Sequence, residues 1–231
     1  MDIPSSLTAE EILIRSGNIG SIKIAQKVGL ENFKDFLENL DLLNKIQFDI
    51  EEVGNPIPFK WGKCKLATSA YGHGITTTPL QLANAYAIIS NGGYKIKPTL
   101  IKQEKNQKRG EQIITQENSN KINEILRKIV TSEQGTANLA NISGYEIAGK
   151  TGTAQKSIRG KYSKKKINTF ASIFPISSPK YVLIVLLDEP KLSETYIYEY
   201  NDGKKRKIIG TPFNTAGWTS VEVAKNLSLI H

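Results

Sequence analysis

The sequence has almost no residues from which a disulfide or a metal site could be built. Cys64 is the single cysteine among 231 residues, which excludes an internal disulfide. The two histidines, His73 and His231, have no clustered carboxylates beside them, whereas a zinc site needs three or four such ligands. We therefore expect no metal and no cofactor. Cys64 has no neighbouring base in sequence, so we interpret it as a bystander thiol.

Long apolar runs are also missing. No stretch approaches the roughly 18 consecutive apolar residues that a transmembrane helix needs. The first six residues lack the basic start and apolar centre of a secretory signal peptide. As it stands, the sequence predicts a soluble chain with no signal and no membrane anchor of its own.

Acidic residues are too few to balance the basic ones. The 31 Lys and Arg residues face 22 Asp and Glu residues, a formal net charge of +9. Such an excess can indicate nucleic acid or an anionic membrane as partner. Here the basic residues gather in two short polar runs, 156–166 and 204–207, which we interpret as solvated loops. We expect no nucleic-acid partner. A basic surface binder stays an alternative, and its binding would fall steeply with salt.

Hydrophobic spacing predicts a helical first half. Capping boxes at 8–11 (T-A-E-E) and 78–81 (T-P-L-Q) open two helices, because each places an N-cap threonine three residues before Glu or Gln. Apolar residues at helical spacing predict further helices over about 19–28, 33–40 and 121–130. The stretch 54–58 (G-N-P-I-P) is expected to be a loop.

The second half has the pattern of strands. Runs at 145–155, 169–176 and 181–187 predict three strands, with 177–179 (S-S-P) as a hairpin turn, and a last helix follows over about 216–229. This order predicts an α+β fold in one domain, with a mainly helical part over 1–144 and a sheet with its closing helix over 145–231.

One predicted strand carries an unusual motif, Lys150-Thr151-Gly152-Thr153. A lysine, two hydroxyls and a glycine weaken strand packing, and glycine inside a strand often marks the close approach of a ligand. The motif offers a cation, two hydroxyl donors and backbone N–H groups to an anionic, peptide-like ligand laid alongside the strand. An ordinary polar strand is the alternative, because K-T-G alone is a short motif.

A second motif, Ser16-Gly17-Asn18, lies at the break between two predicted helices. Taken alone it reads as a helix cap, which serine and asparagine often form. Together with the downstream K-T-G it matches the S-x-N and K-T-G signatures of the penicillin-recognising acyl-serine enzymes.

The surrounding sequence is similar to one branch of those enzymes. Residues 71–83 (Y-G-H-G-I-T-T-T-P-L-Q-L-A), 147–155 (I-A-G-K-T-G-T-A-Q) and the hairpin 170–190 resemble the corresponding segments of class B penicillin-binding proteins. These segments are most similar to those of the division-specific peptidoglycan D,D-transpeptidases. They differ from the corresponding segments of β-lactamases at Ala154-Gln155 and in the hairpin. The resemblance implies the penicillin-binding, serine β-lactamase-like fold: a helical subdomain and an antiparallel sheet.

The resemblance also implies roles for the two motifs. Ser16 would help relay the leaving-group proton, and Asn18 would orient the lysine of the family's S-x-x-K motif and the substrate amide. Lys150 would supply positive potential, and Thr151, Gly152 and Thr153 would bind the substrate, the two hydroxyls at its terminal carboxylate. The backbone N–H of Thr153 would be one donor of the oxyanion hole. The expected partners are a D-Ala–D-Ala stem peptide and β-lactams.

The family's nucleophile is the serine of an S-x-x-K motif that precedes S-x-N, and the fifteen residues before Ser16 contain none. The pattern occurs at 163–166 and 177–180, and we interpret both as coincidence because neither opens a predicted buried helix. We therefore expect a domain truncated on its N-terminal side and inactive alone, with a companion N-terminal fragment as a possible partner. Whether the chain is an enzyme by itself stays open.

The alternative to a cell-wall cross-linking fragment is a non-catalytic module that binds stem peptide or β-lactam reversibly. Reversible binding would survive without the nucleophile, whereas acylation would not. The family is anchored in the inner membrane with a periplasmic domain. Since the sequence itself shows neither signal nor anchor, localisation is left open.

Overall fold

The protein is described from a computed structural model that covers residues 4–51, 53–103, 109–158, 161–200 and 206–230. The chain forms two compact units, each built from two segments of the sequence. The first unit comprises Met1–Ile12 and Gly17–Asn123, and the second comprises Leu13–Ser16 and Glu124–His231. Helices α1 (Ala9–Ile14) and α6 (Gln116–Thr131) contribute residues to both units.

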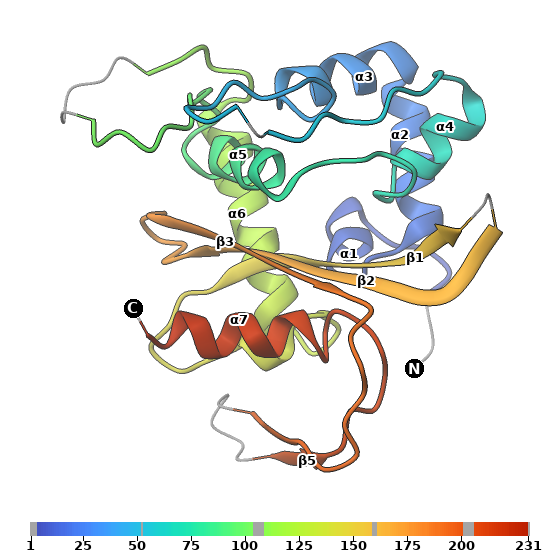
Figure 1. Cartoon of the computed structure of the whole chain (residues 1–231), viewed down its shortest axis with the longest axis vertical. Helices are drawn as coiled ribbons and strands as arrows, with labels where there is room; N and C mark the ends of the chain where they lie inside the picture. Colours follow the sequence, from blue (N-terminus) through green and yellow to red (C-terminus); the bar gives the residue numbers. More distant parts are fainter. Residues whose placement is uncertain (1–3, 52, 104–108, 159–160, 201–205, 231) are drawn as a thin grey trace. The chain divides into compact units, whose positions relative to one another are not determined.

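The first unit is helical. It contains α2 (Asn18–Val28), α3 (Leu30–Asn39), α4 (Lys63–Ser69) and α5 (Pro79–Ser90) (Figure 1). Its core gathers where Leu40 packs with Ala85 and Ile88 of α5, and Leu42, Ile89 and Ile113 surround them. The predicted helices are therefore confirmed, with α6 beginning earlier than expected at Gln116, while α4 was not predicted.

Both predicted capping boxes are present. The Thr8 N–H donates to Glu11 Oε2 at 2.8 Å, and the Glu11 N–H donates back to Thr8 Oγ1 at 3.2 Å. At α5 the Thr78 N–H donates to Gln81 Oε1 at 2.9 Å, and the Gln81 N–H donates to Thr78 Oγ1 at 3.1 Å. These reciprocal bonds satisfy backbone donors that a helix start otherwise leaves unpaired.

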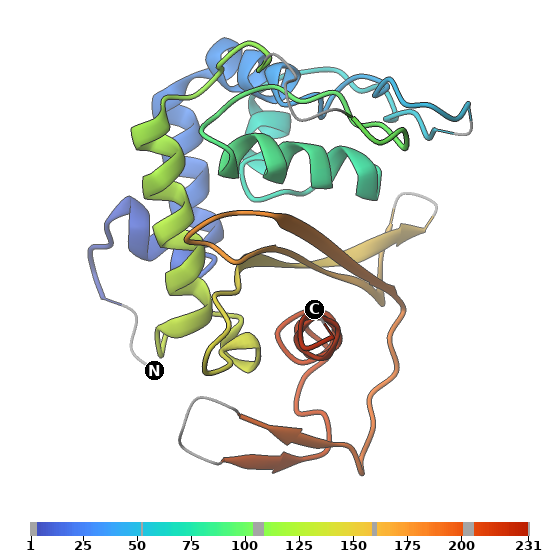
Figure 2. The same ribbon diagram turned by 90° about the vertical axis from the view of Figure 1, so that its left-hand side faces the viewer.

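The second unit is built on an antiparallel sheet in the order β1-β2-β3, formed by β1 (Ala148–Ile158), β2 (Lys161–Phe174) and β3 (Tyr181–Asp188). Helix α7 (Ser220–Ser228) lies along one face of this sheet, as Figure 2 shows almost end-on. The short strands β4 (Ile197–Glu199) and β5 (Lys207–Ile209) form a separate pair. Phe170 of β2 and Val221 of α7 are fully buried, and so is Ile173, which points to the opposite face of the sheet from Phe170. Side chains are therefore buried on both faces of β2. The α+β fold class is confirmed.

One predicted loop is wrong. The basic run 156–166 is not a loop: β1 continues to Ile158 and β2 begins at Lys161, so the two strands form a long hairpin. The lysines are tolerated there because acidic residues at the end of β3 neutralise them. Lys156 Nζ lies 2.9 Å from both Asp188 and Glu189, and Lys165 Nζ lies 2.8 Å from Glu189. In the second basic run, Lys204 and Lys205 lie outside the described residues, and Lys207 begins β5.

Within the described residues, none of the helices combines the length and the apolar character needed to cross a membrane.

Candidate active site

The predicted motif lies on β1, and the strand is placed by a glycine that precedes it. A Cβ at Gly149 would collide with the carbonyl oxygen of Ala171 and with the Phe170 ring on β2. Only glycine therefore lets β1 approach β2 closely enough to pair at this point. The register that results sets Lys150 opposite Ala171 and Thr153 opposite Asn168.

Lys150 contacts Ser16, the serine of the S-x-N motif. Its Nζ donates to Ser16 Oγ at 2.7 Å and to the Thr151 carbonyl oxygen at 3.0 Å. Ser16 has a φ of 58°, a left-handed conformation that non-glycine residues seldom adopt and that is found at functional turns. The turn after α1 thus presents the Ser16 hydroxyl to the strand.

Burial shifts the pKa of this lysine. Desolvation disfavours the ammonium form and lowers the pKa of Lys150 from 10.5 to about 8. A lysine with such a pKa is still mostly charged at neutral pH and can also exchange a proton readily. Strongly shifted pKa values of this kind are concentrated at functional sites.

The two threonines of the motif are held by hydroxyl and backbone partners. Thr151 Oγ1 lies 2.6 Å from Thr136 Oγ1, and either can donate. Thr153 Oγ1 accepts a hydrogen bond from the Ala216 N–H at 2.9 Å. Thr136 and Ala216 come from segments far from β1 in sequence, so tertiary structure brings four polar groups to one place.

These groups border a cavity of about 450 Å³ in the second unit. Its lining combines polar hydroxyls with an aromatic wall and comprises Ser16, Gly135, Thr136, Asn138, Leu139, Thr151, Thr153, Tyr200, Thr215, Gly217 and Trp218. A ligand in this cavity would meet four threonine hydroxyls and Ser16, whose Oγ accepts from the Lys150 ammonium. The arrangement is suited to an anionic group such as a carboxylate.

Gly152 is exposed, and nothing in the chain requires a glycine there. A Cβ at this position would meet only atoms of Thr169, at 4.0 Å. The absence of a side chain instead leaves the backbone of β1 open to a ligand laid beside it, as the sequence predicts.

Asn18 is the first residue of α2 and belongs to the first unit. It is exposed and is not among the residues gathered at the second unit's cavity. The structure therefore brings together Ser16, Lys150, Thr151 and Thr153, and the role of Asn18 stays a prediction.

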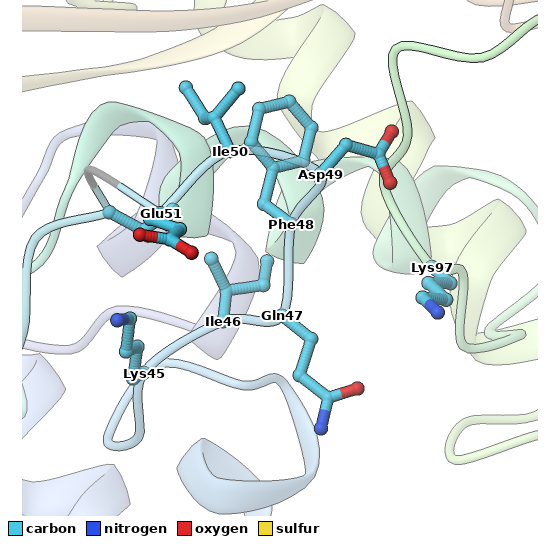
Figure 3. Close-up of a pocket in the computed structure, with 9 residues that line it drawn as sticks. Lys45, Ile46, Gln47, Phe48, Asp49, Ile50, Glu51 and Lys97 are labelled. Carbon is cyan, nitrogen blue, oxygen red and sulfur yellow. The ribbon is translucent and has the colours of Figure 1, made fainter.

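A larger cavity, of about 860 Å³, lies in the first unit and is lined by residues 45–51, Val53 and Lys97 (Figure 3). Asp49, one of its two acidic residues, is already engaged, because its carboxylate accepts hydrogen bonds from the Thr99 hydroxyl and the Leu100 N–H. These bonds lower the pKa of Asp49. We favour the smaller cavity as the active site because it alone of the two is lined by motif residues, namely Ser16, Thr151 and Thr153, and Ser16 is hydrogen-bonded to Lys150.

The two S-x-x-K patterns do not form a nucleophile and base. Ser163 and Lys166 lie on β2, where residues three apart point to opposite faces, and Lys166 Nζ donates to the Asn214 carbonyl oxygen at 2.9 Å. Ser177 lies in the turn before β3, where its N–H donates to Glu146 Oε2 at 3.1 Å. Hydrogen bonds from Ser177 lower the pKa of Glu146. Neither serine lines the active-site cavity.

The sequence of the chain matches a known family. The sequence model described as the penicillin binding protein transpeptidase domain matches residues 2–214. The chain belongs to this family. It is 31% identical over 229 residues to the probable peptidoglycan D,D-transpeptidase FtsI of Caulobacter vibrioides, an alignment that covers 94% of this chain and 36% of that protein. The transpeptidase chain thus spans about a third of the length of this curated relative.

Solved transpeptidase structures share the fold. The apo transpeptidase domain of Burkholderia pseudomallei penicillin-binding protein 3 superposes with a TM-score of 0.78 at 25% identity, covering 97% of this chain and 65% of that one. Penicillin-binding protein 3 of Mycobacterium tuberculosis, complexed with aztreonam, gives the same TM-score and identity and covers 96% of this chain and 50% of that one. The predicted penicillin-binding fold is confirmed.

Reasoning from the sequence missed several residues of the candidate site. Thr136, Tyr200 and the turn that contains Trp218 line the cavity but carry no motif that reasoning from the sequence recognised. A signal does exist in Gly135-Thr136. A Cβ at Gly135 would collide with the Ile129 carbonyl oxygen at the end of α6, so the chain requires glycine there before presenting the threonine.

Proposed function

We propose that this chain carries the substrate-binding half of a peptidoglycan D,D-transpeptidase active site, which cross-links cell wall during division by an acyl-serine mechanism. The observation that carries the proposal is the hydrogen bond from Lys150 Nζ to Ser16 Oγ beside Thr151 and Thr153 in one cavity. Membership of the transpeptidase family supports it. The substrate is the D-Ala–D-Ala end of a stem peptide, which β-lactams imitate.

In this proposal the cavity binds the terminal carboxylate of the substrate. Thr151 and Thr153 donate their hydroxyl hydrogens to it, and Lys150 supplies the positive potential. The lowered pKa of Lys150 lets it exchange a proton with Ser16, and Ser16 passes that proton on to the leaving amine. The Thr153 N–H supplies one donor of the oxyanion hole.

The nucleophilic serine is not supplied by these 231 residues. Both S-x-x-K patterns are positioned away from the cavity, and Lys166 is engaged by Asn214 and Ser177 by Glu146. Loss of the nucleophile from a concerted catalytic unit costs on the order of 10⁶ in rate. The chain alone therefore forms no covalent penicilloyl adduct, and a companion segment with S-x-x-K completes the site.

Labelling with a fluorescent penicillin, read on a denaturing gel, tests the function. The chain alone is expected to give no labelled band. A mixture with the product of the upstream reading frame is expected to label that companion, and a Lys150→Ala variant of the chain should remove the label. Lys161→Ala, an exposed lysine on the neighbouring strand β2, is the matched control. A label on the chain alone would contradict the absence of a nucleophile and would indicate Ser163 or Ser177 as the labelled residue.

A second function is a reversible, non-catalytic binder of stem peptide or β-lactam. The observation that favours it is that the hydroxyl cluster of Thr136, Thr151 and Thr153 is complete within this chain. Equilibrium dialysis with benzylpenicillin separates the two functions. Binding by the chain without labelling of any mixture supports the binder, and labelling of the mixture supports the transpeptidase.

A further inference from the structure

Asn168 is a polar residue with no contact with solvent. It lies on β2, is 0% exposed and stands directly opposite Thr153 of β1. Its Nδ2 lies 2.9 Å from Asn214 Oδ1 and 2.9 Å from Thr219 Oγ1. Burying an amide costs free energy unless the amide is hydrogen-bonded, so both bonds contribute to the stability of this region.

The direction of both hydrogen bonds is fixed by the next residues in the network. Asn214 Nδ2 donates to the Pro190 carbonyl oxygen at 3.1 Å, so Asn214 Oδ1 must face Asn168 as an acceptor. Thr219 Oγ1 donates to the Thr215 carbonyl oxygen at 3.0 Å, so its lone pairs face Asn168. Asn168 must therefore donate twice, and among side chains of its size only a neutral amide can do so.

These bonds hold both ends of the turn 214–219. The same turn is held at two further points, by Lys166 Nζ on the Asn214 carbonyl oxygen at 2.9 Å and by the Ala216 N–H on Thr153 Oγ1 at 2.9 Å. Thr215, Gly217 and Trp218 of this turn line the active-site cavity. Asn168 thus supports one wall of the cavity from the same face of the sheet as Thr153, its partner on β1.

The contact between Ala216 and Thr153 has a chemical consequence. A hydroxyl has one hydrogen to donate, and the Ala216 N–H occupies an acceptor position of Thr153 Oγ1. The Thr153 hydrogen is thereby left for a ligand. We infer that Asn168 is a positioning residue: by clamping the turn 214–219 it keeps the Ala216 N–H on Thr153 and so commits the Thr153 hydroxyl to donate to the carboxylate of the ligand. This inference rests on the proposed function of the cavity.

The test compares reversible binding of benzylpenicillin with that of its methyl ester, which lacks the carboxylate. Wild type is expected to prefer the acid. Thr219→Val, which removes one acceptor without changing side-chain size, should reduce this preference about tenfold, as loss of a charge-assisted hydrogen bond would. Thr219→Ser keeps the acceptor and should keep the preference. Asn168→Asp, which sets carboxylate oxygens against two acceptors, should act at least as strongly as Thr219→Val.

A double substitution separates positioning from general damage to the fold. In a Thr153→Val background the hydroxyl is gone, so Thr219→Val should reduce the acid preference no further. Loss that is equally large in both backgrounds would overturn the inference. So would an unchanged acid preference in Thr219→Val and Asn168→Asp.

A measurement without ligand keeps this inference distinct from the proposed function. Hydrogen exchange of the Ala216 amide should be at least about tenfold faster in Thr219→Val than in wild type or Thr219→Ser, because the loosened turn would no longer hold Ala216 against Thr153. If wild type shows no preference for the acid, the proposed function fails. Unchanged exchange of Ala216 in Thr219→Val would overturn the clamp itself.

Discussion

Lys150 Nζ lies 2.7 Å from Ser16 Oγ, although 134 residues separate the two in sequence. The contact joins the turn after α1 to the first strand of the sheet. It depends on two unusual local features, the left-handed backbone of Ser16 and the partial burial of a lysine. Each of these features gives a testable prediction.

The first prediction concerns pH and Lys150. Its pKa of about 8 means that the ammonium loses its proton as pH rises through 8, so affinity for a carboxylate ligand should fall by up to about tenfold per pH unit above that value. Benzylpenicillin affinity measured from pH 6 to pH 10 checks this. Lys150→Met should bind weakly with a flat profile, and a profile in wild type that is also flat would contradict the assigned role.

The free energy of unfolding should change with pH in the direction opposite to the ligand affinity, rising where the affinity falls. In the unfolded chain Lys150 has its ordinary pKa of 10.5, so between about pH 8 and 10.5 the unfolded state binds more protons than the folded state. The free energy of unfolding contributed by Lys150 therefore rises across this window, and the cost of burying the charge is fully present below it. Urea denaturation of wild type and Lys150→Met at several pH values isolates the contribution, and equal slopes in the two proteins would contradict it.

The second prediction concerns the backbone of Ser16. At a φ of 58° a side chain is strained and glycine is not. Both Ser16→Ala and Ser16→Gly lose the bond to Lys150, but Ser16→Gly should be more stable than Ser16→Ala by about 1 kcal/mol. Urea denaturation measures the difference. Equal stabilities of the two variants would mean that the left-handed conformation costs nothing here.

The third prediction concerns Gln81 in the first unit, which is fully buried. Its Nε2 donates to the carbonyl oxygens of Asp41 at 3.1 Å and Asn44 at 2.7 Å. Gln81→Glu would set a carboxylate against both carbonyls and should lower the free energy of unfolding by about 3 kcal/mol. Gln116→Glu, an exposed glutamine at the start of α6, is the matched control and should change it by less than about 0.5 kcal/mol. Thermal and urea denaturation check both variants.

Local signals in the sequence predicted local structure well. The capping boxes at Thr8 and Thr78 are formed by residues three apart, so the sequence contains both partners of each bond. The hairpin between β2 and β3 was predicted for the same reason, since two strand-like runs flank a short turn. That Ser16 and Lys150 belong to one site was inferred from the resemblance to a family and not from any local pattern, and their direct contact was not predicted.

Features that depend on distant residues were missed or wrong. The basic run at the start of β2 was interpreted as a loop because nothing near it in sequence neutralises its lysines. Asp188 and Glu189, which pair with Lys156 and Lys165, come from the far end of β3. Likewise, no local pattern indicates that Thr136 would meet Thr151, because the end of α6 and β1 approach each other only in the folded unit.

The last prediction concerns a buried ion pair on α7. Lys225 Nζ lies 2.8 Å from Glu222 Oε2, and their side chains are 4% and 8% exposed. The pair joins α7 to β4, because Lys225 also donates to the Glu199 carbonyl oxygen at 3.0 Å and the Tyr196 hydroxyl donates to Glu222 Oε1 at 3.0 Å. Burial and the neighbouring Glu222 carboxylate raise the pKa of Tyr196.

Removal of one member should cost far more than removal of both. Lys225→Met leaves a buried carboxylate unpaired and should lower the free energy of unfolding by about 3–5 kcal/mol, whereas the double variant Glu222→Leu with Lys225→Met should lie within about 1–2 kcal/mol of wild type. Lys34→Met, which breaks the exposed Lys34–Glu38 pair, is the control and should change stability by less than about 0.5 kcal/mol. Urea denaturation of wild type, Glu222→Leu, Lys225→Met and the double variant gives the coupling energy. If the double variant is as unstable as the sum of the single ones, the pair stabilises the fold through its other bonds to β4 and not by mutual neutralisation.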